Sequence, residues 1–449
     1  MSVYTAPGEP SLFFEDLTVS AFGLGKLGLP LAAVLADHGA TVIGVDIDPD
    51  IVDSMEAGRC PVDNEPGLAE YVSQYGGDQL SATTDGETAA SKANIHILLV
   101  PTVVDNDHKP ILKPVLSAAN DIKSGISSGD LVILESTVPP GTTENQLVPA
   151  VTPDDRPIDP GSDFGVAYCP ERTSSGSVIK DLTQSYPKIV GGIDAPSTDV
   201  AATLYREFND LGIIEMGSTT EAEAVKVFEG VYRDVNIALA NELTKACEQW
   251  GIDANTVFDA ANTQPYCDIH DPGIGVGGHC IPVYPHFVTN QASDTPLIES
   301  ARAVNTSMPA HTVDTLETKL DTYDVRLAEA TVLVLGLTYR PGVNELRYAP
   351  AVDTIDLLNE AGSAVVAHDP LLDSETIAEL GATPVSEPAA ANGVDGIILA
   401  TGHKQYAGIN LEELSQAVDT PVFVDGRAFF NAEQLSSFNA TAIGRADTS

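Results

Sequence analysis

Gly23-Leu24-Gly25-Lys26-Leu27-Gly28 directly follows the apolar run Leu17–Phe22 and opens a stretch with helical periodicity. In this setting the glycines permit a tight turn, the close approach of a pyrophosphate and close packing of the helix, whose N-terminus attracts phosphate. Asp46 ends the next apolar run, Thr41–Val45, eighteen residues beyond Gly28. A carboxylate there accepts a hydrogen bond from a ribose 2′-hydroxyl and repels a 2′-phosphate. The stretch therefore predicts a dinucleotide-binding fold that takes NAD rather than NADP.

Short apolar runs separated by helical stretches continue along the first part of the chain. They are Ile95–Val100, Leu131–Leu134 and Phe164–Ala167. Buried runs that alternate with helices are typical of a doubly wound parallel sheet. We therefore expect a NAD-binding Rossmann domain over residues 17–215.

A different pattern begins at Thr220. Thr220 and Glu223 have the spacing of a capping box, and apolar residues then recur at helical spacing as far as Trp250. A helix of this length exceeds an ordinary crossover between strands. We expect it to be the spine of a small all-helical middle region, residues 216–322.

The alternation of strands and helices restarts after this region. Its apolar runs are Thr331–Leu335, Ala364–Ala367, Gly396–Ala400 and Val422–Val424, and a helix is expected over residues 349–361. Only Gly336 stands where a dinucleotide site would have three glycines, so the domain over 328–449 should bind something other than NAD. The predicted fold class is α/β, with two doubly wound Rossmann-like domains joined by a long central helix and a small all-helical middle region.

A single thiol ends a glycine-rich loop in the middle region. The run is Pro272-Gly273-Ile274-Gly275-Val276-Gly277-Gly278-His279-Cys280. Glycines let backbone approach a ligand and leave N–H groups free to hold an anion, and a thiolate delivered there can act as a nucleophile. A hydride-accepting cofactor with a thiol that can hold an acyl group suggests oxidation of an alcohol or aldehyde to an acid. A buried, inert cysteine is the alternative.

Three further polar groups follow strands or lie on the long helix. Ser136–Thr143 follows one strand, and its hydroxyls could hold a water or the nicotinamide ribose, although such runs also form simple turns. Glu171 follows another strand and could activate water, or could be merely solvated. Lys226 lies one turn into the helix and could stabilise an oxyanion, or could direct its amine to solvent.

The charge of the chain is unusual. The 449 residues include 65 acidic and 22 basic side chains, a formal net charge of −43, spread over the whole length. Such a surface repels nucleic acid and anionic membranes and stays soluble where salt screens self-repulsion, so we expect a halophilic protein in a salt-rich cytoplasm.

Cysteine usage and hydropathy point to the same compartment. Five cysteines without zinc spacing indicate reduced thiols and no metal site. The N-terminus lacks the features of a signal peptide, and no apolar run reaches the roughly 18 residues of a membrane span. We therefore expect a cytoplasmic protein without membrane insertion.

Taken together, these motifs resemble the UDP-glucose/GDP-mannose dehydrogenase family over nearly the whole chain from about residue 17. The branch suggested by the Arg233–Leu243 and Gly275–Cys280 runs oxidises UDP-N-acetylmannosamine or UDP-N-acetylglucosamine. The matching runs are Gly23–Gly28, Asn64–Leu68, Ser136–Thr143, Pro170-Glu171, Arg233–Leu243, Gly275–Cys280 and Leu335–Pro341.

The resemblance implies a four-electron oxidation of the sugar C6 hydroxyl to a carboxylate with two NAD⁺. In the family a cysteine attacks the aldehyde, hydride leaves the thiohemiacetal, and water releases the uronate from a thioester. The resemblance also implies that the third domain holds UDP, that the long helix forms the core of a homodimer or higher homo-oligomer, and that the product serves polysaccharide biosynthesis. UDP-glucose remains an alternative substrate.

The resemblance assigns roles by position. Cys280 is the nucleophile, Lys226 an oxyanion and water partner, and Glu171 and Thr137 orient or activate water. The cofactor residues implied are Gly23, Gly25, Lys26, Leu27, Gly28, Asp46, Thr102, Thr137 and Arg347. The substrate residues implied are Glu171, Lys226, Gly275, Gly277, Gly278 and Arg340.

The chain departs from the family pattern at several positions. Gly230 replaces an Asn four residues after the lysine, and Tyr284 replaces an Asp shortly after the cysteine. No Lys or Arg occurs between Lys245 and Arg302. Diphosphate binding would then depend on backbone N–H groups and on Arg302, Arg340 or a neighbouring subunit.

Two other functions remain open. A two-electron hydroxyacid dehydrogenase would form one NADH per substrate and would not need Cys280, but the second α/β domain argues against it. A protein that binds NAD and a nucleotide without catalysis would form no NADH from any nucleotide sugar.

Overall fold

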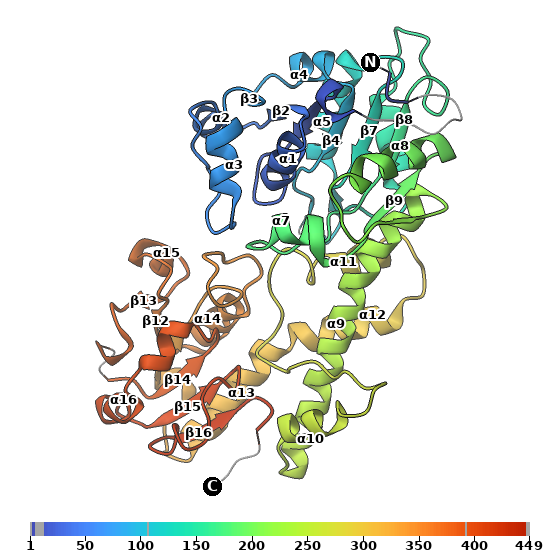
Figure 1. The fold of residues 1–449 in the computed structure, drawn as a ribbon. Coiled ribbons are helices and arrows are strands. Elements are labelled where there is room, and N and C mark those ends of the chain that lie inside the picture. Colours follow the sequence, from blue (N-terminus) through green and yellow to red (C-terminus); the bar gives the residue numbers. More distant parts are fainter. Residues whose placement is uncertain (1, 5–12, 106, 391–392, 446–449) are drawn as a thin grey trace. The chain divides into compact units, whose positions relative to one another are not determined.

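The computed structural model describes residues 2–4, 13–105, 107–390 and 393–445. The chain divides into two compact units, the first made of Met1–Glu229 with His286–Gln291 and the second of Gly230–Pro285 with Ala292–Ser449. Each unit contains one large sheet covered by helices (Figure 1).

The sheet of the first unit has eight strands in the order β10-β9-β8-β7-β4-β1-β2-β3. All neighbours are parallel except β8 and β9. The strands are β1 (Thr18–Phe22), β2 (Thr41–Val45), β3 (Leu80–Thr83), β4 (Ile95–Leu98), β7 (Leu131–Leu134), β8 (Gly165–Tyr168), β9 (Lys188–Gly192) and β10 (Ile213–Glu215). The helices are α1 (Gly28–Asp37), α2 (Pro49–Glu56), α3 (Leu68–Tyr75), α4 (Gly86–Lys92), α5 (Lys113–Gly125), α6 (Val148–Val151), α7 (Val178–Lys180) and α8 (Ala195–Arg206). A hairpin of β5 (Val103–Val104) and β6 (Pro110–Ile111) precedes α5.

The sheet of the second unit has six parallel strands in the order β13-β12-β11-β14-β15-β16. They are β11 (Thr331–Leu335), β12 (Ala364–His368), β13 (Thr383–Pro384), β14 (Gly396–Leu399), β15 (Val422–Asp425) and β16 (Asn439–Ala442), and the helices among them are α14 (Pro350–Ala361), α15 (Ser374–Glu379) and α16 (Leu411–Ala417). This order is the 3-2-1-4-5-6 arrangement of dinucleotide-binding folds. The first sheet has the same arrangement in its six strands β3-β2-β1-β4-β7-β8. The predicted fold class is confirmed.

Helices α9 to α13 separate the two sheets along the chain. They are α9 (Thr219–Trp250), α10 (Ala254–Ala261), α11 (Tyr284–Thr289), α12 (Pro296–Thr306) and α13 (Met308–Asp321). Leu316 and Leu320 of α13 belong to the core of the second sheet. No described helix is apolar enough over sufficient length to cross a membrane.

The predicted cap of α9 is wrong. The helix begins at Thr219, and the Ser218 hydroxyl accepts a hydrogen bond from the N–H of Glu221 at 3.2 Å. The Glu221 carboxylate reaches back to the N–H of Gly217 at 2.7 Å. Ser218 and Glu221 have the same spacing as Thr220 and Glu223, so the sequence contained two candidate boxes and the earlier one forms. Glu223 is left for another contact.

Candidate functional site

The first glycine turn has the geometry that a dinucleotide requires. Gly23 has a φ of +97°, and a Cβ there would lie 2.4 Å from the carbonyl oxygen of Leu99. A Cβ on Gly28 would lie 1.9 Å from the carbonyl oxygen of Gly23, whereas a Cβ on Gly25 would meet nothing within 4 Å. Gly23 and Gly28 are therefore fixed by packing, and the open space at Gly25 suits a pyrophosphate above the N-terminus of α1.

Asp46 lies at the end of β2 and supports the same turn. Its Oδ2 accepts a hydrogen bond from the N–H of Leu24 at 2.8 Å, and its Oδ1 accepts one from the N–H of Asp48 at 3.0 Å. The half-buried carboxylate is thus held beside the turn where a ribose would lie. Lys26 and Leu27 complete the turn before α1, with Lys26 exposed. The residues present fit NAD.

The loop Ser136–Thr143 is tied to β4 at its start. The Ser136 hydroxyl accepts from the N–H of Val100 at 2.9 Å and donates to the carbonyl of Val100 at 2.8 Å. The Thr102 hydroxyl donates to the carbonyl of Thr137 at 2.5 Å. Thr102 and Thr137 therefore lie together at the carboxyl ends of the central strands, which is the ligand-binding edge of such a sheet.

Glu171 and Lys226 are both buried in the first unit. Glu171 is 5% exposed, and its carboxylate accepts a hydrogen bond from the N–H of Thr173. Lys226 is 9% exposed on the second turn of α9. Neither is the solvated surface group that a lone Glu or Lys usually is.

Behind this edge, Glu135 and Lys188 form a buried ion pair. The Lys188 Nζ lies 2.9 Å from Oε2 of Glu135, and the hydroxyl of Tyr205 donates to Oε1 of the same carboxylate. Burial raises the pKa of Glu135, against the opposing effect of Lys188. The pair links the end of β7, from which the Thr137 loop leaves, to β9.

Cys280 is exposed in the second unit, whereas Cys169 and Cys247 are buried. Its carbonyl accepts hydrogen bonds from the N–H groups of Val283 at 3.1 Å and Tyr284 at 2.9 Å, which fold residues 280–284 into a turn leading to α11. The sulfur therefore stands on an ordered turn and is open to a reactant.

The glycines of this loop allow close packing against another segment of the same unit, a role that the sequence did not indicate. Gly278 donates its N–H to the carbonyl of Arg347 at 2.9 Å, so that group is not free for an anion. A Cβ on Gly277 would lie 2.5 Å from the carbonyl oxygen of Tyr348, and Gly275 has a φ of +137° with Pro350 at 3.2 Å. These glycines let the loop pack on the segment that carries Arg340 and Arg347.

Arg427 was missed in the sequence. It follows β15 in Asp425-Gly426-Arg427, and its Nη2 donates to the carbonyl of Gly275 at 3.2 Å. Its Nε donates to the carbonyl of Ala400 at 3.1 Å, and burial lowers its pKa to about 10. The only sequence signal that could have identified Arg427 was its position shortly after a predicted strand. The side chain fixes the start of the glycine loop to the second sheet.

The two arginines named for diphosphate binding have different surroundings. Arg302 pairs with the fully buried Asp234, Nη1 to Oδ1 at 2.6 Å, so it is committed to the fold. The guanidinium of Arg340 lies 5.6 Å from the Tyr339 ring centroid, and among the described residues its buried Nε has no hydrogen-bond partner. Arg340 is therefore the better candidate for an anionic ligand.

The two departures at Gly230 and Tyr284 are in contact. A Cβ on Gly230 would lie 2.3 Å from Cδ2 and 3.1 Å from Cβ of Tyr284. Tyr284 is 7% exposed, so its ring occupies the space beside the helix at Gly230. The absence of a side chain at one position makes room for the large ring at the other.

The first turn of the second sheet resembles the NAD turn but is closed. Gly336 has a φ of +77°, and a Cβ there would lie 2.1 Å from the carbonyl oxygen of Thr401. Asp369 follows β12 as Asp46 follows β2, but it is 4% exposed. Its Oδ2 accepts from the N–H of Leu337 at 2.6 Å and lies 3.1 Å from Nε2 of His403. Its backbone contacts match those of Asp46, but the contact with His403 and the deeper burial distinguish it from the half-buried Asp46 and close it to a ligand.

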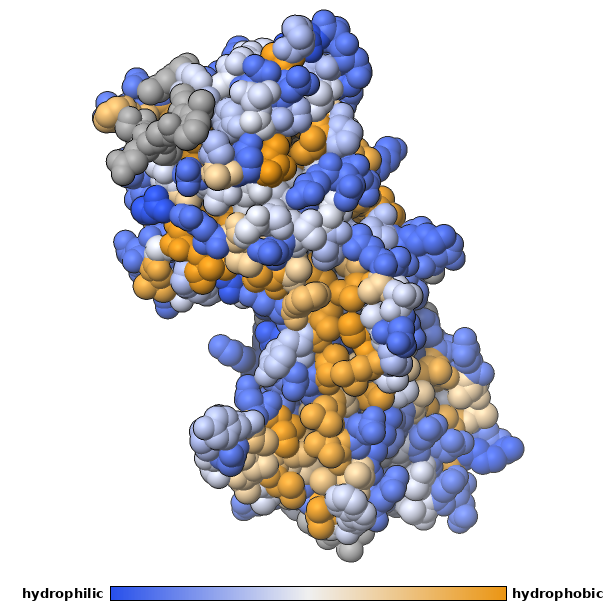
Figure 2. Space-filling model, turned by 90° about the vertical axis from the view of Figure 1, so that its right-hand side faces the viewer, coloured by the Kyte–Doolittle hydropathy of each residue, from blue (hydrophilic) through white to orange (hydrophobic). Residues whose placement is uncertain are grey.

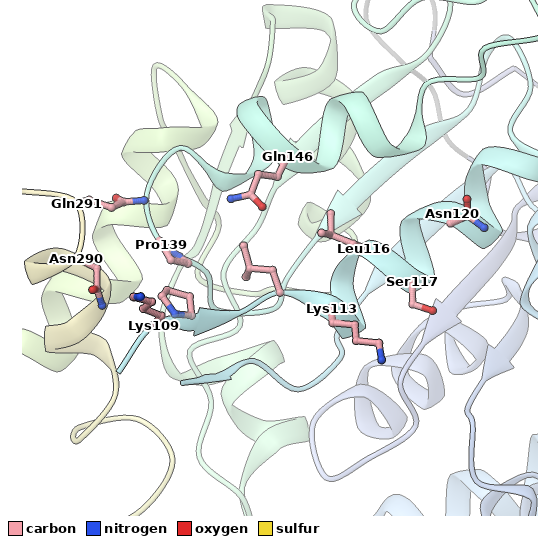
Figure 3. A pocket seen from close by; sticks show the side chains of 11 residues that line it. Lys109, Lys113, Leu116, Ser117, Asn120, Pro139, Gln146, Asn290 and Gln291 are labelled. Atoms are coloured by element: carbon pink, nitrogen blue, oxygen red, sulfur yellow. The ribbon is translucent and has the colours of Figure 1, made fainter. Parts of the chain in front are cut away.

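A groove of about 950 Å³ lies on the first unit beside the Thr137 loop. Its lining side chains come from the β5–β6 hairpin, from α5 and the residue before it, from the loop at Pro139, from the π-helical turn Thr143–Leu147 and from the segment after α11 (Figure 3). Lys109 and Lys113 in its wall are exposed. None of the residues expected to bind the cofactor lines it, so it is distinct from the dinucleotide turn.

Comparison with known proteins relates nearly the whole chain to one family. Three models of the UDP-glucose/GDP-mannose dehydrogenase family match: the NAD binding domain over residues 17–209, the central domain over 220–307 and the UDP binding domain over 333–432. The UDP-N-acetyl-D-mannosamine dehydrogenase of Pyrococcus horikoshii is 33% identical over 434 residues, 96% of this chain and 100% of that protein. The enzyme of the same name from Yersinia pestis is 35% identical over 90% of this chain and 98% of its own. A solved structure of the UDP-D-ManNAc dehydrogenase from Pyrococcus horikoshii covers 96% of this chain and 100% of its own, with a TM-score of 0.87 and 32% identity.

Proposed function

This chain belongs to the UDP-glucose/GDP-mannose dehydrogenase family, and from that premise we propose that it oxidises the C6 hydroxyl of a UDP-N-acetylhexosamine to a carboxylate. The sugar proposed is N-acetylmannosamine or N-acetylglucosamine. The names of the relatives from Pyrococcus horikoshii and Yersinia pestis favour the first. The observation that carries the proposal is the exposed thiol of Cys280 in a chain that also has a complete dinucleotide turn.

The cofactor proposed is NAD⁺, which when bound accepts hydride from the sugar carbon. The N-terminus of α1 and the space at Gly25 would hold the pyrophosphate, and Asp46 would hold the ribose hydroxyls. Gly23 and Gly28 shape the turn, and Lys26 and Leu27 contribute its backbone. Thr102 and Thr137 would meet the nicotinamide half, and Arg347 is proposed as a further cofactor residue.

The catalytic residues proposed are Cys280, Lys226, Glu171 and Thr137. Loss of one hydride from C6 to NAD⁺, with the hydroxyl proton passing to a base, would give the aldehyde, to which the sulfur of Cys280 would add. Loss of a second hydride from the resulting thiohemiacetal to a second NAD⁺ would leave a thioester. Lys226 would stabilise the negative oxygen of the adduct, and Glu171 with Thr137 would orient the water that hydrolyses the thioester. The proposal requires the sulfur to reach the nicotinamide end of the cofactor.

The substrate residues proposed surround the same groups. Arg340, whose buried Nε has no hydrogen-bond partner within the described ranges, would bind the UDP diphosphate. Glu171 and Lys226 would contact the sugar, and the loop of Gly275, Gly277 and Gly278 would deliver Cys280 to it. The domain over residues 328–449 would hold UDP, since its counterpart of Asp46 is closed by His403. The domain over 17–215 would hold NAD.

A spectrophotometric screen of UDP-sugars with NAD⁺ tests the proposal. Two NADH should form per sugar consumed, and Cys280→Ala should abolish complete turnover. One NADH per substrate with full activity of Cys280→Ala would indicate a hydroxyacid dehydrogenase. Binding of both ligands without NADH would indicate a non-catalytic protein, and a preference for UDP-glucose would correct the sugar.

We propose that α9 (the spine of the region 216–322) forms the core of a homodimer. Phe228, Tyr232 and Leu239 recur at helical spacing and are 57%, 56% and 48% exposed. Apolar side chains gather in a band on the face shown in Figure 2. An exposed apolar stripe of this kind is typical of a surface that a second copy covers. Sedimentation should give a dimer or a larger assembly, which Tyr232→Glu should dissociate.

The proposed setting is a salt-rich cytoplasm, where the product would serve polysaccharide biosynthesis. The formal net charge of −43 supports the salt-rich part of this proposal.

A further inference from the structure

Glu223 is fully buried near the start of α9 and serves no helix cap. Its carboxylate instead receives three hydrogen bonds from another segment. Oε2 accepts from the N–H of Gly141 at 2.5 Å. Oε1 accepts from the N–H of Thr143 at 2.7 Å and from the Thr143 hydroxyl at 2.6 Å. A side chain predicted to cap its own helix therefore holds a loop eighty residues away in sequence.

The loop that it holds is Ser136–Thr143, which carries Thr137. The start of the loop is fixed by Ser136 to Val100 and by Thr102 to the carbonyl of Thr137. Glu223 fixes its end, just after the turn at Gly141, where φ is +86°. The loop thus lies between two anchors, one in the segment that follows β4 and one on α9.

The chemistry of the second anchor demands an ionised group. All three contacts are donors aimed at the two oxygens, so only a carboxylate accepts all of them without a competing proton. Hydrogen bonds to an ionised acceptor are about twice as strong as neutral ones. Lys226 lies three residues further along the same helix, so the turn that holds the loop also carries that lysine.

We propose that Glu223 is a positioning residue that ties the Thr137 loop to the turn of α9 bearing Lys226, and so keeps these two groups in register. The proposal rests on the proposed function, because the register matters only if Thr137 and Lys226 act on one substrate. Glu223 would act through the loop that it holds, by its contacts with Gly141 and Thr143.

Glu223 should change its ionisation state near neutral pH, because its pKa is raised. Burial raises its pKa from 4.5 to about 7, against the three hydrogen bonds, and the neighbouring Glu144 of the π-helical turn raises it further. Tyr168 of β8 faces it with a phenol whose own pKa burial raises. On α9 itself the nearby charged groups are Glu221 and Lys226.

The effects on the loop and on stability have opposite signs. The hydrogen bonds from Gly141 and Thr143 lower the pKa of Glu223 against the effect of burial, so their loss with the side chain still buried would raise it further. Protonation as pH falls through 7 therefore favours release of the end of the loop while Glu223 stays buried. Because the folded pKa is the higher one, the stability contributed by this group is present below 4.5 and is lost as pH rises through 7. Acid thus loosens the loop without weakening the fold through this residue.

Amide hydrogen exchange of the full chain at pH 6 and pH 8 tests the anchor without any substrate. Protection factors of Gly141 and Thr143, corrected for intrinsic exchange, should be about tenfold or more higher at pH 8 in the native protein. Glu223→Gln should lose this protection at both pH values. Glu221→Gln, which removes an exposed carboxylate two residues away on the same helix, should behave as the native protein. Equal protection in native protein and Glu223→Gln would overturn the proposal.

The pH profile of turnover tests the consequence. The kcat of the native enzyme should fall as pH is lowered, with a midpoint near 7. Glu223→Gln should have a low kcat that does not fall further over this pH range, with little change in the KM for NAD⁺. If Glu223→Gln does not fold, the native protein's exchange between pH 6 and 8 decides alone, and constant protection refutes the anchor. If no UDP-sugar gives NADH, the proposed function fails while the exchange result stands.

Discussion

Gly230 and Tyr284 illustrate how one contact constrains two positions in this chain. The ring of Tyr284 lies where a side chain at 230 would project, with Cδ2 only 2.3 Å from an ideal Cβ. A ring cannot yield as the end of a flexible side chain does, so any larger residue at 230 forces α9 or the Cys280 turn to move. The Tyr284 N–H also closes that turn on the Cys280 carbonyl.

Gly230→Ala should lower the free energy of unfolding when residue 284 is Tyr and raise it when residue 284 is Ala. In the native chain the substitution should destabilise by about 1–3 kcal/mol through overpacking. In a Tyr284→Ala background it should stabilise by up to about 1 kcal/mol, because alanine is the better helix former. Denaturant unfolding of the four proteins measures this cycle. The same sign in both backgrounds would show that the two residues do not share the space.

Cys280 should be the fastest thiol of the folded protein to react. It is exposed, whereas Cys169 and Cys247 are buried. Burial raises the pKa of the Cys169, Cys247 and Cys60 thiols, which lowers their thiolate fraction. Titration with a chromogenic disulfide near neutral pH should show one rapid equivalent, absent in Cys280→Ser. A rapid equivalent that persists in that variant would place the reactive thiol elsewhere.

At the scale of elements, the ends of β7 and β9 are joined by the Glu135–Lys188 pair. Lys188→Met should cost about 3–5 kcal/mol of unfolding free energy, because it leaves a buried carboxylate unpaired. Burial already raises the pKa of Glu135, so its contribution to stability is lost as pH rises, and the deficit should grow between pH 6 and 8. Adding Glu135→Gln should recover part of the loss, since no charge then remains to be paired. A loss that is constant with pH in the single variant would exclude this cause.

The elements that the sequence predicts well are those set by local pattern. The bounds of β2, β7 and β11 match the predicted runs because each is a short apolar stretch that is mostly buried. The glycine turn and Asp46 are also local, and the structure places them together. The α9 cap was misplaced by two residues because Glu221 and Glu223 satisfy the same spacing.

The contacts that the sequence could not predict join distant segments. Two examples are the packing of Tyr284 on Gly230 and the hydrogen bond from Arg427 to the carbonyl of Gly275. Each contact joins two single residues that are far apart in the sequence, so it produces no periodic pattern. The glycines near Cys280 looked suited to a ligand, yet Gly277 and Gly278 are required by packing on Tyr348 and Tyr339. Motif spacing identifies such glycines, but it does not identify the residues that pack against them.

At the scale of the whole molecule, the dominant property is charge. A formal net charge of −43 on 449 residues produces self-repulsion that opposes the compact state at low ionic strength. The described ion pairs do little to offset it, because several join exposed side chains such as Arg326 and Glu329, and pairs of this kind contribute at most about 1 kcal/mol. Dimerisation through α9 would bring two such charges together, so it too should depend on salt.

Stability should therefore rise with salt. The screening length falls from about 10 Å at 0.1 M to about 3 Å at 1 M, which removes most repulsion between exposed carboxylates. Each 1 kcal/mol gained by a domain of this size raises Tm by about 2–4 °C, so we expect an increase of more than about 4 °C between 0.1 and 1 M KCl. Sucrose at equal osmolality is the control, since it acts by exclusion from the surface without screening. A Tm that is flat in KCl, or that rises equally in sucrose, would show that the acidic surface does not limit the stability of the fold.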